Sequence, residues 1–214
     1  MWTTLAPVFF SFLVVQVLSE DFAGKIVAVA VLRPYASSPS VTSPSGNVTF
    51  IQHDDGTVTV KGFVTGLKKN TAGSQEHGFH IHEKGDLREG CASLGGHYNP
   101  QQKQHGAPDH EVRHIGDLGN IEASPSGVAS FEFEDKIISL TGPYSILGRG
   151  LIVHSDKDDF GRGMFNDSTT TGHAGSRVAC GVIGLVHPIY SSSLQNIAQS
   201  STIVLSLIAL KFLF

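Results

Sequence analysis

The stretch NVTFIQHDDGTVTVKGFV, residues 47–64, has the pattern of a β-hairpin. Its two halves, 47–52 and 57–64, are rich in β-branched and aromatic residues and nearly alternate in polarity, as strands of a half-buried sheet do. The Asp55-Gly56 pair between them is a hairpin turn signal. The stretch therefore predicts two antiparallel strands and a β-rich fold.

Strand-like runs recur outward from this hairpin in both directions. They cover residues 25–32, 76–83, 128–134, 150–154 and 178–186. Long helical periodicity is missing from the sequence, and glycine is abundant at 24 residues. This spacing predicts an all-β antiparallel barrel or sandwich. Two stretches, 84–117 and 155–176, are too rich in glycine and polar residues to be strands, and loops this long are usually functional.

The two ends differ from the single domain expected over residues 22–188. Residues 1–19 are mostly apolar, which is typical of a secretory signal peptide; a buried N-terminal element is the alternative. Residues 189–201 are a serine-rich polar linker. Residues 202–214 are an apolar tail too short for a comfortable membrane span. A GPI-anchor signal, a short membrane-inserted tail and a tail without either role stay open.

Charge and cysteine content limit the function further. The net charge of −4 argues against a nucleic-acid partner, which needs a basic face. Cys91 and Cys180 are the two cysteines, and in a secreted chain an even count favours a disulfide over a pair of free thiols. Asn47 and Asn166 begin glycosylation sequons. Together with residues 1–19, these features predict an extracellular protein, secreted or attached to the cell surface.

Histidine is frequent, with 11 residues, and most of the histidines cluster. His80 and His82 lie on one face of their strand because side chains alternate with period two. The long loop and the next strand end add His97, His105, His114, Asp117 and His154. Imidazole suits Cu(II) and Zn(II), and zinc also accepts carboxylate. The cluster therefore predicts one site that holds two metal ions.

Five stretches resemble the copper/zinc superoxide dismutase family. GFHIHEKGD (78–86) and GHAGSRVACGVIG (172–184) resemble its two signatures. GHYNP (96–100), HG (105–106) and RHIGDLGN (113–120) keep the family's order and spacing. The resemblance covers about residues 25–187. It implies an eight-stranded antiparallel Greek-key β-barrel with two long functional loops.

The resemblance also implies a role for each candidate site residue. The copper ligands would be His80, His82, His97 and His154, and the zinc ligands would be His97, His105, His114 and Asp117. His97 would bridge the two metals. Asp158 would bond the far nitrogens of His80 and His105 and so fix both rings. Cys91 and Cys180 match the family's disulfide.

The implied reaction converts superoxide to dioxygen and hydrogen peroxide, which protects against reactive oxygen species. Copper would alternate between Cu(II) and Cu(I), and zinc would stay structural. Arg177 would hold the incoming anion beside the copper. His97 would take a proton when its bond to copper breaks and give it to the second superoxide. Family members form homodimers through the face near Gly85, Leu147-Gly148 and residues 182–186, which are apolar or small here.

One loop departs from the family pattern. In residues 161–171, Thr170 stands where a steering lysine often occurs, and Met164 and Phe165 add apolar bulk. We expect slower and less salt-sensitive capture of superoxide, with part of the positive field supplied by Arg162. The histidines without an implied ligand role are expected to be surface or loop residues: His53, His77, His110, His173 and His187.

Three rival functions fit parts of the pattern. A copper carrier with a related domain typically lacks part of the copper set and has a transfer cysteine pair, whereas this chain has a complete set and no spare cysteine. A copper-only dismutase lacks the zinc ligands, which are all present here. A scaffold used only for surface interactions would not need Arg177. The copper/zinc enzyme fits best.

Overall fold

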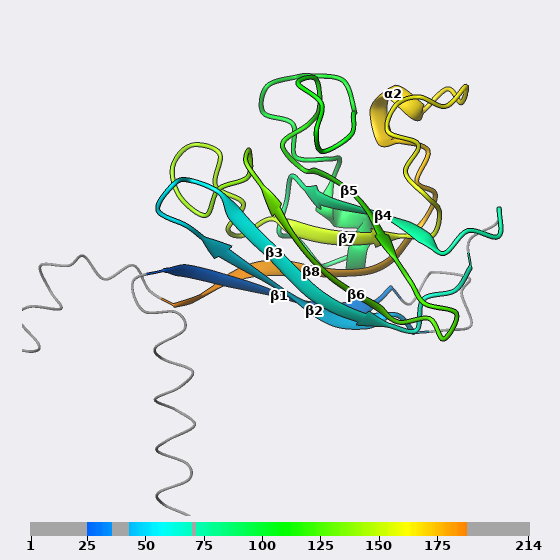
Figure 1. Cartoon of the computed structure of the whole chain (residues 1–214), viewed down its shortest axis with the longest axis horizontal. Coiled ribbons are helices and arrows are strands. Elements are labelled where there is room, and N and C mark those ends of the chain that lie inside the picture. Colours follow the sequence, from blue (N-terminus) through cyan, green and yellow to red (C-terminus); the bar gives the residue numbers. More distant parts are fainter. Residues whose placement is uncertain (1–24, 36–42, 70–71, 188–214) are drawn as a thin grey trace, which may run out of the picture. The chain divides into compact units, whose positions relative to one another are not determined.

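The computed structural model of the chain describes residues 25–35, 43–69 and 72–187 (Figure 1). The expected signal peptide (1–19), linker (189–201) and tail (202–214) lie outside these residues. Within the described ranges, no helix has the length and apolar character needed to cross a bilayer.

Eight strands form one sheet. They are β1 (Ile26–Pro34), β2 (Ser45–Gln52), β3 (Val58–Thr65), β4 (Glu76–His82), β5 (Asp117–Glu122), β6 (Ala129–Asp135), β7 (Gly150–His154) and β8 (Arg177–His187). Their order in the sheet is β5-β4-β7-β8-β1-β2-β3-β6. The two outer strands, β5 and β6, contact each other, so the sheet is nearly closed into a barrel. Because β3 lies beside β6 and β4 beside β7, the connections have the Greek-key pattern. The expected antiparallel all-β barrel is confirmed.

The hairpin expected at residues 47–64 pairs β2 with β3, from Ser45 opposite Thr65 to Gln52 opposite Val58. Its turn is stabilised by Asp55, whose Oδ1 accepts hydrogen bonds from the Thr57 amide (2.9 Å) and hydroxyl (2.7 Å). Gly56 adopts φ +90°, a conformation that side chains disfavour. The turn residues therefore set the register of the two strands.

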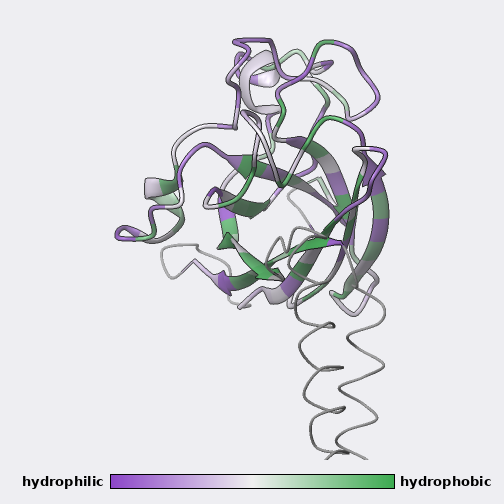
Figure 2. Cartoon of the chain, turned by 90° about the vertical axis from the view of Figure 1, so that its left-hand side faces the viewer, coloured by the Kyte–Doolittle hydropathy of each residue, from purple (hydrophilic) through white to green (hydrophobic). Residues whose placement is uncertain are grey.

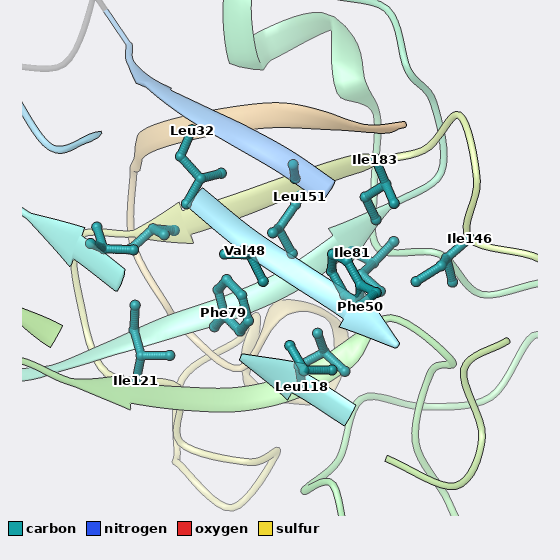
Figure 3. Close-up of a cluster of buried hydrophobic side chains, with 14 of the residues drawn as sticks. Leu32, Val48, Phe50, Phe79, Ile81, Leu118, Ile121, Ile146, Leu151 and Ile183 are labelled. Carbon is teal, nitrogen blue, oxygen red and sulfur yellow. The ribbon is translucent and has the colours of Figure 1, made fainter. Parts of the chain in front are cut away.

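Alternation along the strands builds the core inside the barrel. Figure 2 shows hydrophobic and hydrophilic segments alternating along the strands. Figure 3 shows Val48, Phe50, Phe79, Ile81 and Leu151 packed against one another, and all five are fully buried. Truncating one of the phenylalanines to alanine would cost about 3–5 kcal/mol. The core thus gives the metal centre a rigid support.

β5 (Asp117–Glu122) is the strand that the sequence pattern does not predict. It is short, it follows the long loop directly, and Gly119 within it adopts φ +82°. Its register with β4 also shifts between Gly78 and His80, which marks an irregularity in the ladder. A six-residue strand with a bent backbone carries too little periodicity to be recognised.

Candidate metal centre

β4 supports the centre because one face of the strand packs in the core and the other face carries two ligand candidates. Phe79 and Ile81 point into the core, so His80 and His82 point to the other face. That face is covered by chain as well, since both histidines are buried. Figure 1 shows the long loop around residues 100–115 and the short helix α2 (Ser168–Thr171) on the same side of the barrel as β4 and β5.

The remaining ligand candidates come from a neighbouring strand and from the long loop. β7 pairs with β4 and ends at His154. His97 is placed beside His82 because the loop runs along the end of β4, with the Tyr98 amide donating to the Ile81 carbonyl (2.8 Å). One nitrogen from each of four rings lies within 4.8 Å of the others: His80, His82, His97 and His154.

Three of these imidazoles use one ring nitrogen to donate a hydrogen bond to the protein. The bonds join His80 Nε2 to Asp158 Oδ2 (2.8 Å), His82 Nδ1 to the Gly95 carbonyl (2.9 Å) and His154 Nδ1 to the Gly175 carbonyl (3.3 Å). A neutral imidazole has one N–H, so the other nitrogen presents a lone pair. Two such nitrogens, His82 Nε2 and His154 Nε2, face each other at 3.4 Å. Lone pairs that converge in a buried space need a cation between them.

Unpartnered nitrogens show that the set fits a metal. Among the described residues, the buried His80 Nδ1 and His97 Nε2 have no hydrogen-bond partner. Leaving a buried polar atom unpaired costs about 1–3 kcal/mol. A metal ion would satisfy both atoms, and four imidazole nitrogens suit Cu(II).

A second donor set shares His97 and is arranged around Asp117 at the start of β5. Asp117 Oδ1 lies 2.8 Å from His97 Nδ1, 3.1 Å from His105 Nδ1 and 3.0 Å from His114 Nδ1. Its other oxygen, Oδ2, accepts hydrogen bonds from the amides of Gly106 (3.1 Å) and His114 (2.8 Å). Three imidazoles and one carboxylate oxygen therefore converge, which is the donor set of a closed zinc site.

Asp158 connects the two sets. Its Oδ2 accepts the His80 Nε2 proton and its Oδ1 accepts the His105 Nε2 proton, each at 2.8 Å. Because an ionised carboxylate only accepts, these bonds turn the far nitrogen of each ring toward the donor sets. Gly172 leaves the room for this arrangement, since a Cβ there would collide with both Asp158 and His105.

The protonation states differ between the two sets. Burial, followed by the charge of neighbouring imidazoles, lowers the pKa of His80, His82 and His154 well below the usual value. Burial also lowers the pKa of His97, although Asp117 opposes it. These rings are therefore neutral at pH 7, which is the metal-binding form.

In the donor set around Asp117, burial lowers the pKa of His105, but Asp117 and Asp158 outweigh burial and raise that pKa to about 9. Burial raises the pKa of Asp117, but hydrogen bonds from His105, His114 and His97 hold it well below the usual value. A bound zinc ion would therefore replace the proton that His105 carries beside Asp117 at neutral pH.

Arg177 lies at the edge of the four-imidazole set. In the β7–β8 ladder it stands opposite His154. Its guanidinium donates to the carbonyls of Cys91, Ala92 (3.1 Å) and Gly95 (2.5 Å), so its direction is fixed. Burial and the neighbouring imidazoles are the larger causes that lower the pKa of His82 and His154. The charge of Arg177 lowers both pKa values further. The arginine therefore acts electrostatically on the same rings that present lone pairs.

The disulfide between Cys91 and Cys180 joins the loop to β8, with Cα atoms 5.7 Å apart. Cys91 belongs to the 3-10 helix η1 (Gly90–Leu94). With Leu94 and Ile152, the two cysteines form a small buried cluster apart from the main core. The carbonyls that hold Arg177 thus come from a covalently tethered segment.

Three residues support the centre although no sequence signal assigned them a role. His77 was expected at the surface and is instead 2% exposed, and its Nδ1 donates to the His154 carbonyl (2.9 Å). Asn120 of β5 bonds both the amide (2.7 Å) and the carbonyl (3.0 Å) of Asp158. Arg113 donates to the Asp117 carbonyl (2.9 Å). Each acts on the backbone of a site residue, which residue type and spacing do not reveal.

Arg113 is also fully buried and pairs with Asp135 at the end of β6 (2.6 Å). This ion pair ties the long loop to the barrel. The other expected surface histidines, His53, His110 and His173, are partly exposed and lie outside the strands, and the His187 side chain is outside the described part of the chain.

The loop 161–171 lies against the zinc-side donor set. The His105 amide donates to the Thr169 carbonyl (2.9 Å). Met164 is fully exposed, and the Phe165 ring stacks on His173 with centroids 3.6 Å apart. Arg162 is in hydrogen-bond contact with His110.

Fold and site together define a β-barrel protein with two histidine-rich metal sets that share one imidazole. Residues 44–183 match the family model described as copper/zinc superoxide dismutase (SODC). The chain is 54% identical over 145 residues to an extracellular superoxide dismutase [Cu-Zn] of Drosophila melanogaster, covering 67% of this chain and 77% of that protein. It also resembles the crystal structure of the clock protein EA4, with a TM-score of 0.66 and 46% identity over 75% of this chain and 94% of the other.

The chain belongs to the copper/zinc superoxide dismutase family. Copper and zinc are the metals of that family, and the two donor sets described above fit them. Membership extends beyond a shared barrel, because the match includes every stretch that supplies a candidate ligand.

Proposed function

We propose that this chain is an extracellular superoxide dismutase, which converts two superoxide anions and two protons into dioxygen and hydrogen peroxide. One observation carries the proposal. Arg177, a fixed cation, stands opposite His154 at the edge of four imidazoles whose lone pairs converge. A binding site for a small anion beside a redox metal needs this combination.

We assign the ligands to two unequal sites. His80, His82, His97 and His154 would hold copper, and His97, His105, His114 and Asp117 would hold zinc. Bound copper supplies the one-electron redox change, while zinc keeps its oxidation state and has a structural role. Asp158 positions His80 and His105 through their far nitrogens.

The protein's own groups guide the anion and the proton. Arg177 binds superoxide and orients it, because its guanidinium is held by three backbone carbonyls and does not need to reorganise. His97 would carry a proton at Nε2 when this nitrogen is free of copper, and it would give that proton to the second superoxide. Its Nδ1 is fixed on the Asp117 side, so the proton stands on the side of the ring where the substrate arrives. Burial of the surrounding imidazoles keeps bulk water out of this space.

The test measures superoxide removal and metal content on the same preparations. Arg177→Ala should keep both metals and lose about 10²-fold in rate, because only anion positioning is removed. His154→Ala should lose copper and activity but keep zinc. Full activity in His154→Ala would refute the assignment, and a zinc loss equal to the copper loss would refute two separate sites.

We also propose that the protein is a homodimer. Gly85 packs against Gly148 and lies close to Val182, so the residues expected at the interface form one patch. Leu185 and Val186 extend it as exposed apolar side chains. Sedimentation should give twice the chain mass, and Val186→Lys should lower it to the chain mass. A wild-type protein that sediments as a single chain rejects the dimer.

Secretion and attachment to the cell surface complete the proposal. Support comes from the disulfide, which persists in oxidising compartments, and from the extracellular relative. We propose that residues 1–19 direct secretion, that residues 202–214 specify a lipid anchor, and that Asn47 and Asn166 are candidates for glycosylation. A phosphatidylinositol-specific phospholipase should release the protein from intact cells. Protein found free in the medium without the phospholipase, or retained after it, contradicts the anchor.

A further inference from the structure

Arg149 immediately precedes β7 and holds two segments that carry proposed copper ligands. The residue is partly buried. Its Nη1 donates to the Glu83 carbonyl (2.8 Å), and its guanidinium lies over the Tyr98 ring, 3.5 Å from the ring centre. Glu83 follows His82 in the chain, and Tyr98 follows His97. One guanidinium therefore contacts the neighbours of two ligand candidates that come from different parts of the sequence.

Contacts with the preceding turn and with β8 fix the position of Arg149. Its Nε donates to the Ser145 carbonyl (2.9 Å). Its main-chain amide donates to the Ile146 carbonyl (3.2 Å), and its carbonyl accepts a hydrogen bond from the Ile183 amide of β8 (2.9 Å). Because the guanidinium is anchored to the barrel in this way, it can hold the long loop in place rather than move with it.

The segment that leads to His97 has little rigidity of its own. Gly95 adopts φ +77° and Gly96 follows it, so two residues without side chains precede the ligand candidate. An isolated bridge pairs His97 with His82. His97 Nδ1 is held on the Asp117 side (2.8 Å), so the main chain around His97 decides where Nε2 points. A contact that fixes this main chain therefore also fixes the direction of Nε2.

We propose that Arg149 is a positioning residue for copper, which clamps the His82 and His97 segments together and so sets the separation of two of the four imidazoles. The inference rests on the proposed copper ligands. Arginine suits the task because its guanidinium is planar: its face stacks on the Tyr98 ring while its N–H groups donate to the carbonyls of Glu83 and Ser145. The compact ammonium of lysine keeps the charge but cannot make all three contacts at once.

The clamp acts on the copper set more than on the zinc set. Arg149 contacts the neighbours of two copper ligand candidates, His82 and His97. The zinc set shares His97, but its other three members lie in residues 105–117 and are held by Asp117 and Asp158. Loss of the clamp should therefore weaken copper binding selectively.

The test compares Arg149→Lys with the wild-type protein by chelator competition, with zinc added to metal-free protein and Cu(II) added to zinc-loaded protein. Copper affinity should fall about 10-fold, the lower end of the loss that supporting contacts of metal ligands cause, and zinc affinity should change less. The electron paramagnetic resonance spectrum of bound Cu(II), which reports ligand geometry, should show a changed parallel hyperfine splitting. Arg88→Lys is the matched control, because Arg88 is exposed and pairs with Asp86 (2.8 Å), and it should change neither readout. Val48→Ala controls for destabilisation alone.

Three results would overturn the clamp while the copper site stands. The first is a wild-type spectrum and copper affinity in Arg149→Lys. The second is a loss of copper affinity that Val48→Ala reproduces or that zinc affinity matches. The third is an Arg149→Lys variant that sediments at half the wild-type mass, because a broken contact between copies near Gly148 would then explain the loss. A wild-type chain that does not hold copper at the four imidazoles would refute the proposed site, and the clamp with it.

Discussion

The main-chain carbonyl of Cys91 accepts a hydrogen bond from the guanidinium of Arg177. Cys91 is also disulfide-bonded to Cys180, three residues after Arg177 in β8. The covalent link and the hydrogen bond thus join the same two segments. The disulfide therefore helps to fix the position of Arg177, the residue proposed to bind the anion, as well as stabilising the fold.

Replacing both cysteines by serine should lower activity more than it lowers metal content. On the chain-entropy model, losing this link across a sequence separation of 89 costs about 4.6 kcal/mol. Release of the Cys91 carbonyl should misplace Arg177 and reduce the rate about 10²-fold. Superoxide assays on metal-loaded protein measure the effect. The core variant Val48→Ala is the control for destabilisation alone, and an equal rate loss in that variant would contradict a positioning role.

Asp158→Asn should weaken binding of both metals. His80 and His105 bond different oxygens of Asp158, so in asparagine one of these acceptors is replaced by an NH2 group that would face an imidazole N–H. Loss of such a supporting contact typically costs about 10- to 100-fold in metal affinity. Competition with chelators measures both affinities. The same substitution at the exposed Asp109 should change neither, and unchanged affinity in Asp158→Asn would rule out its role.

The sequence predicts most of the barrel because most strands carry a recognisable local pattern. The hairpin 47–64 has near alternation and a clear turn, and the structure confirms it together with the runs at 76–83 and 150–154, which are buried on both faces. β5 lacks that signal, since it is short and contains a glycine at positive φ. The class of fold is thus encoded locally, while the eighth strand depends on its pairing with β4.

The ligand candidates could be identified because metal chemistry restricts residue types. The residues that hold the backbone of the ligands could not be identified from the sequence. His77 acts through the His154 carbonyl, and Arg113 acts through the Asp117 carbonyl. Any polar side chain of suitable length could make such bonds, so its type carries no specific signal. His77 was wrongly expected at the surface because it pairs with the buried Ile121 of β5, the strand that the sequence pattern does not reveal.

Thr170→Lys should increase the rate of superoxide capture a few-fold at low salt. Thr170 is exposed on α2, in the loop that contacts His105, and a cation there would add to the field of Arg177. Because exposed charges are screened, the gain should shrink as ionic strength rises. Pulse radiolysis across a salt series measures both effects. Thr170→Gln controls for side-chain length, and equal rates and salt slopes for all three proteins would contradict electrostatic steering through this loop.

Zinc binding to the metal-free protein should release protons at neutral pH. His105 has a raised pKa of about 9, so it carries a proton below that pH, and zinc must displace the proton from Nδ1. Apparent zinc affinity should therefore rise with pH and level off above about 9. Calorimetry in buffers of different ionisation enthalpy counts the released protons. Binding without proton release at pH 7 would contradict the protonated state of His105.

We propose that two unequal metal sites share His97. Anomalous diffraction from crystals of the metal-loaded protein, collected at the copper and zinc absorption edges, tests it most directly. We expect copper among His80, His82, His97 and His154, and zinc among His97, His105, His114 and Asp117. Copper in both positions at full zinc supply, or a His97 ring that contacts only one metal in the oxidised protein, would contradict it.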